Sequence, residues 1–97
     1  MKNYKIGQII YTYDQDTIYQ YEIEFLGASS FLVKGWNEMD NTEFGYSDKF
    51  IFNSFKECKE KFLKELERDR IKNVKLEKHE DRYGKWWEVI YWEKEDE

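Results

Sequence analysis

The sequence lacks proline altogether and contains a single cysteine and a single histidine among its 97 residues. One cysteine excludes a disulfide framework within the chain. One cysteine and one histidine also exclude the common structural zinc sites, which draw most of their ligands from these two residue types. No apolar run approaches the ~18 residues of a membrane-spanning helix, and the first residues lead into no apolar region typical of a signal peptide. These absences favour a protein of the cell interior.

Aromatic side chains are abundant and make up 20% of the chain. Disordered chains are poor in aromatic residues, because they cannot bury enough apolar surface to fold. We therefore expect a folded chain, and its length is that of one domain covering residues 1–97.

Charge is distributed unevenly along the chain, although the net charge is only −5. Residues 12–48 contain eight acidic side chains and only one basic side chain, Lys34. The isoelectric point of about 5.0 argues against a protein that binds duplex DNA, since such proteins carry a basic face. Two interpretations stay open. The acidic residues keep the protein soluble, or they form a surface that meets a basic partner.

Four apolar segments in the first half predict strands, and a polar loop over residues 37–49 precedes the last of them. The expected strands cover residues 4–13, 17–26, 31–36 and 50–52. Strict alternation in the second segment predicts a half-buried antiparallel strand. Its apolar face would carry Tyr19, Tyr21, Ile23 and Phe25, and its solvent face Gln20, Glu22 and Glu24.

The second half of the chain predicts one helix and a hairpin. Ser54 and Glu57 form a capping box, which marks the start of a helix over residues 54–71. An apolar stripe at helical spacing follows, made of Phe55, Cys58, Phe62, Leu63 and Leu66. Residues 74–93 predict a β-hairpin with Gly84 in its turn, and residues 94–97 an acidic tail. The fold class is therefore α+β: an antiparallel sheet of about four strands over residues 4–52, one amphipathic helix, then a C-terminal hairpin.

Two segments resemble parts of small bacteriophage and prophage accessory proteins. Lys5–Tyr11 is similar to their opening strand, and Phe50–Cys58 to the element in which an aromatic strand meets a Ser or Thr cap and a Glu. The resemblance covers roughly residues 4–66. It implies a small, bent antiparallel sheet closed by one helix, and an accessory protein that acts in the cytoplasm of a bacterial host. It transfers no catalytic residue.

Catalytic and metal-binding patterns are missing from the sequence. His79 lies near the expected hairpin turn without a nucleophile motif beside it, and Cys58 lies on the apolar helix stripe, where a buried thiol is inert. The acidic pairs at residues 14/16 and 38/40 lack the spacing of a calcium loop. We therefore expect a protein that is not an enzyme and that uses no metal or cofactor.

Candidate partner-binding residues come from the acidic segment and from the tryptophan-rich hairpin. Adjacent Trp86 and Trp87 point to opposite faces of a strand. Alternation then groups Trp87 with Tyr91 on one face, and that face either packs in the core or binds a partner. The candidates are Asp14, Asp16, Glu22, Glu24, Glu38 and Asp40 together with Trp36, Trp87 and Tyr91.

The functional hypothesis is a phage-type accessory protein that binds a host protein with a basic surface. A more specific version is an anti-CRISPR-like inhibitor of a nucleic-acid-handling defence system, because carboxylates can occupy a channel built to bind phosphates. One alternative is a self-associating assembly protein, such as a homodimer, that uses its Trp-rich hairpin. Another is a single-stranded nucleic-acid binder, against which the mostly negative neighbouring charges count.

Overall fold

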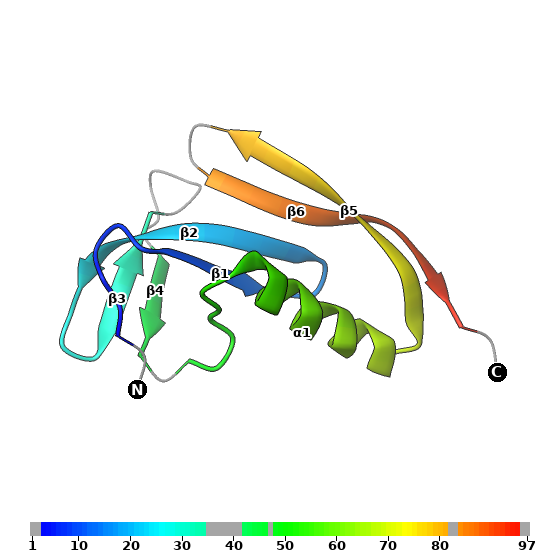
Figure 1. Ribbon diagram of the computed structural model, residues 1–97, viewed down its shortest axis with the longest axis horizontal. Coiled ribbons are helices and arrows are strands. Elements are labelled where there is room, and N and C mark those ends of the chain that lie inside the picture. The colour runs from blue at the N-terminus through cyan, green and yellow to red at the C-terminus, as the bar shows by residue number, and fades with distance from the viewer. Residues whose placement is uncertain (1–2, 35–41, 47, 82–83, 96–97) are drawn as a thin grey trace.

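The computed structural model describes residues 3–34, 42–46, 48–81 and 84–95, which form six strands and one helix (Figure 1). In chain order these are β1 (Ile9–Tyr13), β2 (Thr17–Leu26), β3 (Ser30–Val33), β4 (Thr42–Gly45), α1 (Phe55–Arg68), β5 (Ile71–Asp81) and β6 (Gly84–Lys94). The strands pair antiparallel in the order β4-β3-β2-β6-β5, and β1 pairs with β2 as well. The α+β architecture of an antiparallel sheet with one helix is confirmed.

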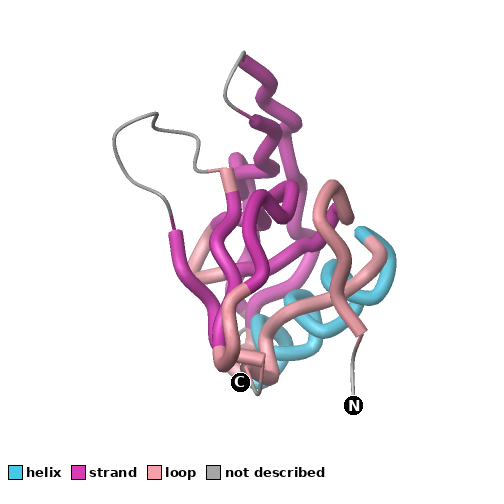
Figure 2. Tube along the Cα trace, turned by 90° about the vertical axis from the view of Figure 1, so that its left-hand side faces the viewer, coloured by secondary structure: helices cyan, strands magenta, loops and turns pink. Residues whose placement is uncertain are grey.

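The sheet is wider than the expected four strands, because the C-terminal hairpin joins it. Strand β6 pairs with β2 from Thr17↔Glu88 to Gln20↔Lys85. Helix α1 lies between β4 and β5 in the chain, as predicted, and packs against the sheet. Figure 2 shows it lying along one side of the strands.

The prediction of a strand over residues 50–52 is wrong. Within that segment only Phe52 makes a bridge, to Tyr11. The strand before the helix is instead β4, which lies inside the stretch predicted as a loop over residues 37–49 and pairs Phe44 with Phe31. Four residues with one apolar side chain carry too little periodicity to predict a strand.

The element boundaries differ from the predicted ones at positions of unusual backbone conformation. Strand β1 begins at Ile9 instead of residue 4, because the chain turns at Gly7, whose φ is +88°. The helix ends at Arg68 instead of residue 71, since Arg70 has a φ of +64° and cannot continue it. The hairpin is longer than predicted and includes Lys94, which was assigned to the acidic tail.

Ser54 is confirmed as the residue that caps the start of the helix. The Ser54 hydroxyl accepts the backbone N–H of Glu57 at 3.1 Å. The predicted apolar stripe faces the sheet, with Cys58 and Phe62 fully buried.

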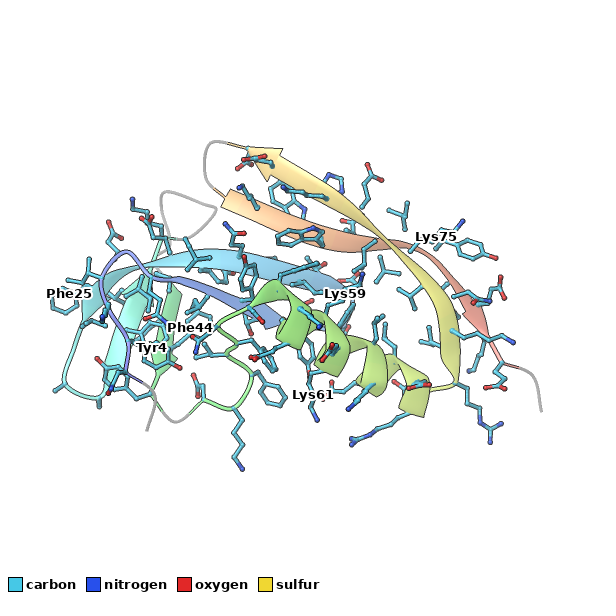
Figure 3. The ribbon with its side chains drawn as sticks, in the orientation of Figure 1. Tyr4, Phe25, Phe44, Lys59, Lys61 and Lys75 are labelled. Carbon is cyan, nitrogen blue, oxygen red and sulfur yellow. The ribbon has the colours of Figure 1, made fainter. Side chains whose placement is uncertain are left out.

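Two apolar clusters cover opposite faces of the β1–β2 pair. Ile10 belongs to the first cluster, which also holds Tyr4, Ile23, Phe31, Val33 and Ile51. Tyr11 and Tyr13, on the other face of β1, pack in the second cluster with Ile18, Cys58 and Phe62 beneath the helix. Figure 3 shows Tyr4 and Phe44 together at the β3–β4 end of the molecule. Two strands buried on both faces make the centre of the fold.

The predicted alternation in β2 fails at a β-bulge. Pairing shifts register between Ile23 and Phe25, so Glu24 is the extra residue. The shift turns Phe25 outward, where 57% of it is exposed. The opposite face is not a solvent face either, because Ile18 is fully buried there under the helix.

A second bulge changes the faces of the hairpin. Lys75 pairs with Tyr91 and Leu76 with Val89, which leaves Ile90 without a partner residue. The alternation predicted for β6 therefore holds only up to Val89. Beyond the bulge, Trp92 returns to the helix side beside Val89, and Tyr91 lies on the opposite side near Lys75.

The helix cap provides a test of the fold. We expect Ser54→Ala to lower the free energy of unfolding by about 1 kcal/mol, because the Glu57 N–H loses its acceptor. Chemical denaturation followed by circular dichroism measures the change. Ser29→Ala, at an exposed turn position, is the control, and an equal loss in both variants would contradict the capping role.

Candidate protein-binding surface

The described acidic candidates lie at opposite ends of β2. Asp14 and Asp16 are in the turn before the strand, whereas Glu22 and Glu24 lie toward its far end. Six residues of extended chain place Asp16 and Glu22 about 20 Å apart at ~3.3 Å per residue. The structure therefore does not bring these four side chains together. Trp36, Glu38 and Asp40 lie outside the described residues.

The Glu22 end of β2 carries mixed charge. The Glu22 carboxylate forms a 2.9 Å ion pair with Lys34, and its hydrogen bond and charge raise the pKa of the Lys34 ammonium. Nearby, Glu80 and Lys85 are 3.7 Å apart. These four side chains line an open hollow of about 260 Å³. Since carboxylates there have ammonium neighbours, this end of β2 is a weak candidate for binding a basic partner.

The Asp14–Asp16 turn is held firmly at the other end. The Tyr19 hydroxyl donates to Asp14 Oδ2 at 3.1 Å, and the Thr17 hydroxyl donates to Asp16 Oδ1 at 2.9 Å. The backbone N–H of Val89 donates to the Asp16 carbonyl at 2.9 Å, which ties the turn to β6. Both aspartates nevertheless stay exposed. Their carboxylates are thus fixed in position and accessible to solvent.

An open hollow of about 550 Å³ separates this turn from the C-terminal half of α1. We call it the acidic hollow, because Asp14, Glu65 and Asp69 are among the residues that line it. No lysine or arginine is among the described residues that line it, although Arg68 is near enough to affect the pKa of the Tyr13 phenol. Its remaining lining is largely apolar: Tyr13, Phe50, Phe62, Leu66 and Ile71, with Gln15.

The field in the acidic hollow favours a positive charge. The helix ends at Arg68, and the C-terminal end of a helix carries partial negative charge. Burial, and after it the Glu65 carboxylate, raises the pKa of the Tyr13 phenol, against a smaller opposing effect of Arg68. The Tyr13 side chain therefore stays neutral, and its ring packs against those of Phe50, Phe52 and Phe62.

A smaller hollow adjoins the acidic hollow. It measures about 180 Å³ and is lined by Leu66, Ile71, Val89 and Trp92, with Gln15 and Asp16. We call it the apolar hollow. The two hollows share Gln15, Leu66 and Ile71 and are therefore direct neighbours.

The two described aromatic candidates, Trp87 and Tyr91, differ in exposure. Trp87 is half-buried beneath the helix, with its ring 4.4 Å from that of Phe55 and 6.1 Å from that of Tyr11. Tyr91 is 45% exposed; its hydroxyl donates to Glu93 at 2.7 Å, and the Lys75 ammonium lies 5.3 Å from its ring. Trp87 thus packs within the fold, and Tyr91 faces outward.

Sequence reasoning missed Glu65, Asp69 and Trp92. Glu65 and Asp69 belong to a helix whose many charges all look like a solvated face, although they are four residues apart and border the apolar stripe. Trp92 was not among the candidates, because alternation alone places it on the face opposite Trp87 and the sequence does not reveal the bulge at Ile90.

The single cysteine and histidine have packing roles. Burial raises the pKa of the Cys58 thiol to about 12. The His79 ring stacks on Trp86, with 5.3 Å between the ring centres. Within the described part of the chain, no three His, Cys, Asp or Glu side chains are grouped so that they could hold a metal ion.

The burial of Cys58 predicts its reactivity. We expect a thiol reagent at neutral pH to leave native Cys58 unmodified, because the thiol is fully buried and its pKa of about 12 keeps it protonated. Absorbance of the released chromophore, with and without denaturant, measures the reaction. Rapid modification of the folded protein would contradict this assignment.

Trp87 and Trp92 differ in burial, which predicts different responses to alanine. Trp87→Ala should lower the free energy of unfolding by about 2 to 3 kcal/mol, because it removes half-buried contacts beneath the helix. Trp92→Ala should cost less than about 1 kcal/mol, since 52% of Trp92 is exposed. Denaturation curves of both variants test this, and a reversed order would contradict the assigned burial.

No protein-family model matches this chain, and no curated protein or solved structure is similar enough to match it. The one helix of the described residues is too short and too polar to cross a membrane.

Proposed function

We propose that this chain is a non-catalytic, phage-type accessory protein that binds a basic surface of a host protein. The acidic hollow is the observation that carries the proposal. Three carboxylates and the C-terminal end of a helix act together there, above an aromatic floor and without a lysine or arginine in the lining. Such a site attracts lysine and arginine side chains.

The partner chemistry that fits this surface is that of a nucleic-acid-binding protein. Channels for DNA or RNA present clustered lysine and arginine side chains, which the carboxylates of Asp14, Glu65 and Asp69 can engage in place of phosphates. Binding would then block the channel, as in an inhibitor of a nucleic-acid-handling defence system.

Matched charge reversals on one helix test the proposal. Glu65→Lys with Asp69→Lys reverses two carboxylates of the acidic hollow, whereas Glu60→Lys with Glu67→Lys makes the same change in net charge at exposed positions that do not line it. Capture from bacterial host lysate, identified by mass spectrometry, compares both variants with the wild type. We expect the first variant to lose a basic nucleic-acid-binding protein that the wild type and the second variant retain.

Salt and competition complete this experiment. The captured complex should weaken as the salt concentration rises, because exposed charges are screened over ~8–10 Å near physiological ionic strength. An oligonucleotide should compete for the captured protein. The proposal would be refuted if the amount of captured protein changed neither with salt nor with either pair of charge reversals. Direct binding of the oligonucleotide by this chain would indicate a nucleic-acid binder instead.

Self-association through the hairpin is the second candidate. Three consecutive large side chains are solvent-exposed there: Ile90 at 55%, Tyr91 at 45% and Trp92 at 52%. Exposed aromatic residues are common anchors of protein interfaces. If the chain forms a homodimer through them, light scattering should show a mass that rises with concentration and that Tyr91→Ala lowers. A constant monomer mass would exclude this candidate.

A further inference from the structure

We infer that the acidic hollow and the apolar hollow form one docking groove for a short segment of the partner, in which an apolar side chain neighbours a lysine or arginine. This inference rests on the proposed function and specifies what that site binds. The apolar side chain would occupy the hollow beside Trp92, and the cationic one the hollow beside Asp14, Glu65 and Asp69.

The continuity of the two hollows supports a single occupant. Gln15, Leu66 and Ile71 line both, so the two hollows adjoin directly. A large exposed ring borders each one: Phe50, 53% exposed, at the acidic hollow and Trp92, 52% exposed, at the apolar hollow. An extended segment crossing Leu66 and Ile71 would contact both rings.

Charge selects the residue type in the acidic hollow. A lysine or arginine can lay its methylene stem against the Phe50 and Tyr13 rings while its charged end reaches the carboxylates. A negatively charged occupant would meet three carboxylates and the negative end of the helix, and no described lining residue would neutralise it.

Apolar surface selects the neighbouring residue. Leu66, Ile71, Val89 and Trp92 line most of the apolar hollow. Its two polar lining residues are Gln15 and Asp16. The Asp16 carboxylate already accepts a hydrogen bond from the Thr17 hydroxyl. A leucine-sized side chain would remove apolar surface from water on both partners, which is the main source of affinity at such an anchor.

A defined peptide tests the groove directly. Acetyl-Lys-Leu-Lys-amide presents the leucine with a lysine on either side, so chain direction does not matter. We expect it to shift the NMR signal of the Trp92 indole N–H in a saturable manner. Replacing leucine by glycine, or both lysines by glutamates, should weaken binding at least about tenfold. No saturable shift, or equal binding of the three peptides, would overturn the inference.

Variants of the protein locate the contact. Trp92→Ala and Glu65→Lys with Asp69→Lys should each weaken peptide binding at least about tenfold, as followed through the backbone amide signals of Leu66 and Ile71, since Trp92→Ala removes the indole signal. Phe25→Ala is the matched control, because Phe25 is a similarly exposed aromatic residue at the far end of β2. Binding that is equally affected by Phe25→Ala, or unaffected by the groove variants, would overturn the assignment.

The outcome for the host protein separates this inference from the proposed function. If capture is lost with Glu65→Lys/Asp69→Lys but persists with Trp92→Ala, the partner binds the charge alone and the groove inference fails while the proposed function stands. If the peptide binds the groove but the charge reversals do not change the capture of the host protein, the proposed function fails. If light scattering shows a second copy that Trp92→Ala displaces, the groove belongs to a homodimer interface and the inference is overturned.

Discussion

Strand β2 is the element on which the rest of the structure depends, because it supplies two edges and two faces to its neighbours. Ile23 exchanges backbone hydrogen bonds with the segment leading into β1, whereas the carbonyls of Asp16 and Glu22 accept from β6 and from the end of β3. Peptide groups alternate between the two edges of a strand. β3 and β6 therefore follow one another along the same edge, opposite β1. The groove lies at one end of this strand, where the turn, the helix and the hairpin meet.

The sequence predicted correctly those elements whose signals lie within a few consecutive residues, namely the helix and the hairpin. Ser54 and the apolar spacing after it place the helix, and the two runs around residue 84 place the hairpin. The predicted faces of β2 and β6 were wrong, because one extra residue in each strand reverses which side chains are exposed. The bulges at Glu24 and Ile90 each exchange the two faces of a strand without a proline or glycine to mark them. Alternation is therefore a sound guide to strand existence and a poor guide to which side chains are exposed.

The candidate site was predicted only in part, because it joins segments that are distant in the sequence. Asp14 and Asp16 stood out in the acidic segment, but Glu65 and Asp69 come from a helix some fifty residues later. Glu22 stood out equally, although its ion pair with Lys34 partly neutralises it. Composition showed an excess of carboxylates, and only the arrangement in space shows which of them share a hollow. In the same way, Trp87 and Trp92 are indistinguishable as residues and differ only in what covers them.

Strand β5 bears on how this protein behaves at high concentration. It has eleven residues and ends the strand order, so its outer edge resembles a template for a further strand. Lys72, Lys75 and Lys78 are exposed along it, and the register breaks twice between Lys72 and Leu76, near Asn73 with a φ of +53°. A second chain adding there would have to follow an irregular backbone. The exposed lysines and the irregular backbone both work against strand-by-strand aggregation at this edge.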